Sequence, residues 1–119
     1  MGTGTYILTP NGRVKEERDS IRWARWFERA NKDRILARTE IAEGVRVSTV
    51  FLGLDHNFGG DGPPILWETM IFGGPLDGYQ ERYATSDDAQ LGHLEAVKRA
   101  REAQAREERA PDDDTEGAR

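Results

Sequence analysis

Two successive runs of alternating side chains, separated by a short turn, constrain the fold of this chain more than any other feature. In residues 34–41, and again in residues 45–52, apolar or small side chains occupy every second position. A period of two is typical of a β-strand with one buried face. Glu43 and Gly44 leave room only for a tight connection between the runs. The two runs therefore predict an antiparallel hairpin.

The rest of the chain adds strands and two helices to this hairpin. Asp19 or Ser20 can cap a helix that ends near Asn31, and residues 85–88 can cap a last helix of about 86–109. Further strands are predicted at residues 5–8, 65–72 and 79–84. The order β-α-β-β-β-β-α predicts an α+β fold, in which an antiparallel four- to five-stranded meander carries two helices packed on one face.

The composition limits the chemistry of the chain. Its 119 residues have a net charge of -5 and include no cysteine, so no disulfide, thiolate nucleophile or Cys-type zinc site is expected. The apolar runs are too short to cross a bilayer, and we expect no export signal, no membrane partner and no cofactor. Residues 1–110 should form one domain. Residues 111–119 hold four acidic residues and one basic residue, and are predicted to be a disordered acidic tail.

Glycine and proline are concentrated between Gly53 and Gly78, in the two connections that flank the strand predicted at residues 65–72. This segment holds seven glycines and three of the five prolines. Such connections can be wide turns shaped by steric need. They can also converge into a recess whose backbone amides bind an anion. The second interpretation predicts a binding site at Gly59, Gly60, Gly73 and Gly74.

The first of these connections begins with polar residues of the kind that bind metal ions or ligands. Asp55 should accept backbone amides and fix its loop, with His56 exposed beside it. The segment departs from a calcium-binding loop, because Gly59 stands at the fifth position and Leu66 stands where a glutamate is required. We therefore assign no metal. A divalent ion held by Asp55, His56, Asp61 and Glu68 is the weaker alternative.

Two further residues, Glu68 and His93, are predicted to need an ionic or hydrogen-bonding partner. Glu68 is the single charge in an apolar strand, so it should pair with His93, with Arg82 or with a ligand. His93 lies among small residues on one face of the last helix. A core histidine bonded to Tyr83, Glu68 or Thr69 would fit there, and so would a ligand-binding or general-base imidazole.

Basic residues recur every three or four positions along the first helix and place a stripe on one side of it. Trp26 lies at the edge of this stripe, which is either a solvated face or a surface that stacks on a base or binds a phosphate. Duplex nucleic acid is not expected as a partner, because the body is nearly neutral and the tail is acidic. The stripe consists of Arg18, Arg22, Arg25, Arg29 and Lys32.

One long stretch of the sequence resembles a known group of proteins. Val-Ser-Thr-Val-Phe-Leu-Gly-Leu-Asp-His occupies residues 47–56, followed by Gly-Pro-Pro at 62–64 and Trp-Glu-Thr-Met-Ile-Phe-Gly-Gly at 67–74. Across residues 20–97 the chain resembles a family of small uncharacterised phage and prophage proteins. The resemblance implies a phage genome and a bacterial host cytoplasm, but no reaction. It also rests on Trp23-Ala24, Trp26-Phe27-Glu28, Arg82-Tyr83 and Gly92-His93.

These features favour a non-enzymatic binding protein over an enzyme. The three serines lie at helix starts or inside a strand, and the sequence contains no phosphate-binding loop, dinucleotide fingerprint or nucleophile elbow. The leading hypothesis is a phage protein that sequesters a small anionic or nucleotide ligand, or antagonises a host factor. The residues predicted to contact the ligand are His56, Asp55, Gly59, Gly60, Glu68, Gly73, Gly74, Tyr79, Arg82, Trp26 and His93.

Two alternatives belong to other functional classes. Leu91 and Leu94 project away from the small-residue face of the last helix, so they could pack on the first helix or be covered by a second subunit. The latter arrangement predicts a protein–protein interaction module that forms a homodimer. The second alternative is a minor metal- or His-dependent hydrolase that uses His56 or His93.

Overall fold

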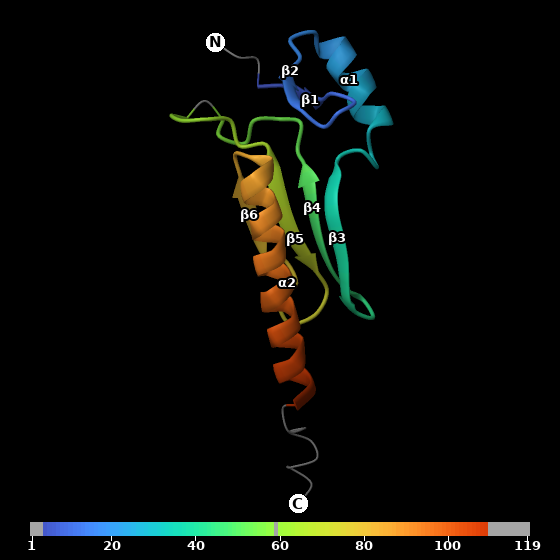
Figure 1. Ribbon diagram of the computed structural model, residues 1–119, viewed down its shortest axis with the longest axis vertical. Helices are drawn as coiled ribbons and strands as arrows, with labels where there is room; N and C mark the ends of the chain where they lie inside the picture. The colour runs from blue at the N-terminus through green and yellow to red at the C-terminus, as the bar shows by residue number, and fades with distance from the viewer. Residues whose placement is uncertain (1–3, 59, 110–119) are drawn as a thin grey trace, which may run out of the picture.

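The computed structural model describes residues 4–58 and 60–109, which form two helices and six strands (Figure 1). The predicted acidic tail, residues 111–119, lies outside this described part of the chain. The helices are α1 (Ser20–Arg29) and α2 (Ser86–Arg109). The strands are β1 (Tyr6–Leu8), β2 (Val14–Glu16), β3 (Ile35–Ala42), β4 (Val45–Phe51), β5 (Trp67–Phe72) and β6 (Gln80–Tyr83).

Four of the strands form an antiparallel meander in the order β3-β4-β5-β6. The hairpin predicted from the alternating runs is its first half, in which Thr39 pairs with Val47. β5 pairs with β4, and β6 pairs with β5. Because each connection joins neighbouring antiparallel strands, consecutive turns lie at alternate ends of the sheet. This rule decides where the two Gly-rich connections are placed.

The residues before β3 form a small unit at one end of this sheet (Figure 1). β1 and β2 pair as a two-stranded sheet, and α1 begins after Asp19, whose side chain accepts hydrogen bonds from the Ile21 and Arg22 amides at 3.0 Å each. Trp23 Nε1 donates to the backbone oxygens of Tyr6 and Gly53. These bonds tie α1 to β1 and to the chain that leaves β4.

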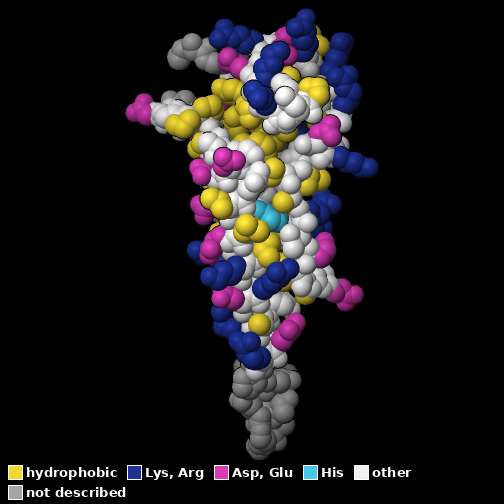
Figure 2. Space-filling view, in the orientation of Figure 1, with side chains coloured by type: hydrophobic (Ala, Val, Ile, Leu, Met, Phe, Trp, Pro, Cys, Tyr) yellow, Lys and Arg dark blue, Asp and Glu magenta, His cyan; other side chains and the backbone are white. Residues whose placement is uncertain are grey.

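The predicted basic stripe lies on α1 and on the residues that flank it, Arg18 and Lys32. All five of its members are exposed, and Figure 2 shows lysine and arginine gathered over this end of the molecule. Trp26, at the edge of the stripe, is half-buried and meets Phe51 edge to face, with 6.0 Å between the ring centroids. Its indole therefore covers the end of the sheet rather than standing free for stacking.

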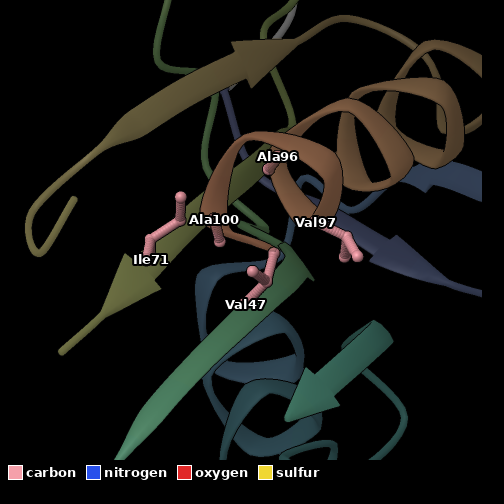
Figure 3. Close-up of a cluster of buried hydrophobic side chains, with 5 residues drawn as sticks. All are labelled: Val47, Ile71, Ala96, Val97 and Ala100. Carbon is pink, nitrogen blue, oxygen red and sulfur yellow. The ribbon is translucent and has the colours of Figure 1, made fainter. Parts of the chain in front are cut away.

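α2 lies lengthwise over one face of the meander and closes the core (Figure 1). Val47 and Ile71 point from β4 and β5 towards the helix and are fully buried. The helix meets them with Ala96, Val97 and Ala100, which let its backbone approach closely (Figure 3). A second cluster lies nearer α1 and is formed by Phe51, Leu66, Trp67 and Ala89.

The predicted α+β class, the antiparallel meander and both helices are confirmed. Of the two helices predicted to pack on one face, only α2 does so and contacts all four strands of the meander, whereas α1 packs against β1 at one end of the sheet. β2 was not expected, since its three residues are too few to show a period of two. Within the described residues, neither helix has the combination of length and apolar character needed to span a membrane.

Candidate functional site

The two Gly-rich connections lie at opposite ends of β5, so the prediction that they converge is wrong. One connects β4 to β5 and the other connects β5 to β6, and the six residues of Trp67–Phe72 separate them (Figure 1). A strand of that length spans about 20 Å. Gly60 is therefore far from Gly73 and Gly74, and these glycines do not form one recess. Gly59 lies outside the described residues.

The β5–β6 connection supports the alternative of a turn shaped by steric need. Gly73 has φ +82°, and a Cβ on it would come within 1.8 Å of the Gly44 backbone oxygen in the β3–β4 turn. Its amide donates to Asp77 Oδ1 at 2.7 Å. Gly74 has φ +72° and abuts Val45. The glycines let two turns at this end of the sheet pack closely together.

The β4–β5 connection is held by Asp55, as predicted. Asp55 Oδ1 accepts hydrogen bonds from the Asn57 amide at 2.7 Å and from the Ile65 amide at 2.9 Å, so one carboxylate joins the two ends of the loop. His56 Nδ1 lies 2.9 Å from the Leu54 backbone oxygen. Among the described residues, no group of three or more His, Asp or Glu side chains could hold a metal ion.

Glu68 and Arg82 form an ion pair on the sheet face that points away from α2. Arg82 Nε donates to Glu68 Oε2 at 2.9 Å, and Gln80 Nε2 donates to the same oxygen. Of the three partners predicted for Glu68, the structure thus assigns Arg82. Tyr79 packs against the core beside α2, where the Arg99 guanidinium lies 5.9 Å from its ring centroid. Neither Tyr79 nor Trp26 lies with this ion pair.

His93 belongs to a buried row of polar side chains between α2 and the sheet. Its Nδ1 atom lies 2.7 Å from Thr49 Oγ1, and its Nε2 atom lies 2.9 Å from Thr39 Oγ1. Thr49 Oγ1 is also 2.5 Å from Thr69 Oγ1. Burial lowers the pKa of His93 below its ordinary value, which favours a neutral imidazole that donates from one nitrogen and accepts at the other. His93 is therefore a hydrogen-bonded core residue, but its direct partners are Thr39 and Thr49 and not the predicted Tyr83, Glu68 or Thr69.

A groove runs beside this histidine, between α2 and the edge strand β3. It has a volume of about 270 Å³ and is lined by Leu36, Ala37, Gln90, His93 and Leu94. Leu94 is 65% exposed, and Leu91, one turn before it on α2, is 67% exposed. Figure 2 shows apolar side chains open to solvent on this side of the molecule. We call Leu91, Leu94 and this groove the docking face.

A smaller hollow of about 170 Å³ lies on the opposite face of the sheet. It contains Glu68, whose carboxylate is already paired with Arg82. Neither of these two described hollows is lined by lysine or arginine. The smaller hollow is lined by Ser48, Val50, Glu68, Met70 and Phe72.

The predicted site residues thus fall into separate places, and only Glu68 and Arg82 are brought together by an ion pair. The exposure of Leu91 and Leu94 agrees with the sequence analysis, whereas the groove and the row of threonines were missed. One signal was present, because Thr39, Thr49 and Thr69 all occupy inward positions of their strands. No family model matches the chain, and no curated protein or solved structure matches it significantly.

Proposed function

We propose that the protein is a non-enzymatic protein-interaction module whose docking face binds a partner chain. The observation that carries the proposal is the pair Leu91 and Leu94, which each leave about two thirds of their surface in solvent, and of which Leu94 also lines an apolar groove. Apolar surface gathered next to a concave floor is typical of an interaction site rather than of scattered surface leucines. One helix covers the sheet on this side and leaves the margin along β3 open.

A protein partner fits this surface better than a small anion does. The groove is lined by aliphatic side chains, a glutamine and a histidine that burial keeps neutral. An anion would find no positive side chain there, and the Gly-rich turns that were expected to bind it lie at opposite ends of β5. An apolar side chain from another polypeptide, in contrast, would displace water from both the groove and the leucines.

The resemblance to phage and prophage proteins, which stays a prediction from the sequence alone, is the basis for proposing a partner in the cytoplasm of a bacterial host. The binding of a small anionic or nucleotide ligand and the hydrolase alternative stay predictions. Antagonism of a host factor is compatible with the proposal, since the docking face could occupy a surface that a host protein needs.

Photo-cross-linking in bacterial cells tests the proposal. A photoreactive phenylalanine analogue replaces Leu94 in one variant and the exposed Glu43, in the β3–β4 turn, in the control variant. We expect discrete cross-linked protein bands from position 94 and none from position 43. Mass spectrometry of the bands would identify the partner chain and the peptide that is attached. Equal, diffuse labelling from both positions would contradict a docking face on α2.

A further inference from the structure

The outward side of α2 carries four residues whose spacing makes a self-complementary ridge. Asp87, Leu91, Leu94 and Lys98 are separated by four, three and four positions, so at 3.6 residues per turn they form one stripe along the helix. All four are exposed. The opposite side of the helix, with Ala89, Ala96 and Ala100, is buried against the sheet. The ridge therefore points away from the core, and Leu94 at its edge also lines the groove beside β3.

The order along the ridge is acid, leucine, leucine, base. Asp87 and Lys98 lie at equal distances from the midpoint between the two leucines, so reversing the helix exchanges one charge for the other. A second α2 that runs antiparallel, with Leu91 of one copy against Leu94 of the other, places Asp87 of each copy opposite Lys98 of its partner. A parallel pairing would place like charges together and is disfavoured.

We propose that two copies of this chain associate through this ridge, as an antiparallel α2–α2 pair with the two sheets outermost. The inference rests on the proposed function, because it names a second copy as the chain that covers Leu91 and Leu94 of the docking face. Among the described residues, neither Asp87 nor Lys98 takes part in an ion pair. Both charges are thus free to pair across the interface. Leu91 and Leu94 from both copies form its apolar centre.

Sedimentation equilibrium of the full chain tests the pairing. We expect concentration-dependent association to twice the 13.4 kDa mass of one chain. Leu91→Asp should weaken association at least tenfold, because it removes a buried leucine from each half of the interface. Circular dichroism checks that the helix is retained. Asp87→Lys alone and Lys98→Asp alone should each weaken association at least threefold, because each creates two like-charge contacts.

The decisive variant is Asp87→Lys combined with Lys98→Asp, which restores opposite charges in the antiparallel dimer. Its dissociation constant should return to within threefold of the wild-type value. Asp88→Lys is the matched control. It lies in the same first turn and loses the same favourable interaction with the helix dipole, but it points away from the ridge. It should leave association within twofold of wild type.

Three results would overturn the inference: a monomer up to millimolar concentration, a dimer that Leu91→Asp does not weaken, or a double variant as weak as the single variants. None of these would by itself remove the proposed function. A monomer that still forms cross-links from position 94 to another protein would keep the docking face and exclude self-association. A protein that neither self-associates nor forms cross-links from position 94 would contradict both proposals.

Discussion

The Nδ1 atom of His93, on α2, lies 2.7 Å from Oγ1 of Thr49, on β4. This contact is one part of a continuous row, because His93 also meets Thr39 and Thr49 also meets Thr69. The row joins α2 to β3, β4 and β5 through directional bonds. These bonds add a directional constraint to the apolar packing of the helix on the sheet, and so help to fix the direction of the α2 ridge.

The buried imidazole should make stability depend on pH. Because burial lowers the pKa of His93 in the folded chain, the unfolded chain takes up a proton first as the pH falls. The contribution of His93 to the free energy of unfolding should therefore be fully present above about pH 6.5, the ordinary pKa of histidine. The free energy of unfolding should decrease as the pH falls from there towards the folded-state pKa. Urea unfolding at pH 7.5, 6.5 and 5.5 measures the decrease.

The matched variants for this prediction are His93→Gln and His56→Gln. Carboxylates contribute to the pH dependence of all three proteins, so the difference between wild type and His93→Gln isolates the buried imidazole. His56 lies in the β4–β5 loop, outside the polar row. We expect His56→Gln to keep the wild-type decrease and His93→Gln to reduce it. An unchanged decrease in His93→Gln would show that the imidazole is not the cause.

Thr49→Val tests the polar row without changing its volume much. The substitution removes the hydroxyl that serves both His93 and Thr69, and leaves a buried ring nitrogen without its partner. We expect the free energy of unfolding to fall by about 1–3 kcal/mol. Ser48→Ala, at the next position and on the opposite face of the sheet, is the control. If Thr49→Val and Ser48→Ala lower the free energy of unfolding by the same small amount, the row does not contribute to stability.

Asp55→Ala should loosen the β4–β5 loop. The carboxylate accepts two backbone amides, from Asn57 and Ile65, and its removal leaves both without a protein partner. We expect hydrogen exchange at Asn57 and Ile65 to accelerate about tenfold or more, since bonds to a charged acceptor are worth about 1.5–3 kcal/mol each. Asp61→Ala, in the same loop, should leave exchange at Ile65 unchanged. Equal acceleration by both variants would argue against a specific role for Asp55.

Gly92→Ala should destabilise the chain, although alanine favours helices. A Cβ at position 92 would lie 2.1 Å from the Tyr83 hydroxyl oxygen and 2.2 Å from Cζ of that ring. Overpacking of this kind costs about 1–3 kcal/mol, against a helix-propensity gain of about 1 kcal/mol. Thermal or urea unfolding measures the net loss. In a Tyr83→Leu background the clash is gone, and Gly92→Ala should become neutral or stabilising there.

The sequence was most informative where period and side-chain size act locally. The alternation around Val47 and Thr49 located the hairpin, and the alanines of the last helix located its buried face. Asp55 was identified as a loop anchor because an aspartate before a long, glycine-containing loop commonly accepts nearby amides. These inferences need only neighbours in the chain. β2 was not predicted, because the three residues Val-Lys-Glu have no distinguishing pattern.

The candidate site could not be predicted in the same way. The two Gly-rich turns share a composition that suggested one site, but consecutive connections of an antiparallel meander lie at opposite ends of the sheet, so the predicted recess was inconsistent with the predicted fold. The groove depends on how far α2 sits from β3, which is a property of packing. Glu68 had three plausible partners in sequence, and only the register that pairs it with Arg82 decides among them.

The most direct test of the α2 ridge as an interface is a distance between two copies of α2. Because the chain has no native cysteine, Arg106→Cys accepts a single spin label near the end of the helix. At a rise of about 1.5 Å per residue, the antiparallel pair places the two labels about 40 Å apart along the helix axis. Pulsed dipolar spectroscopy should show a distance near this value, and Leu91→Asp should abolish it. A distance below about 20 Å, as side-by-side parallel helices would give, or no intermolecular distance at all, would contradict the account.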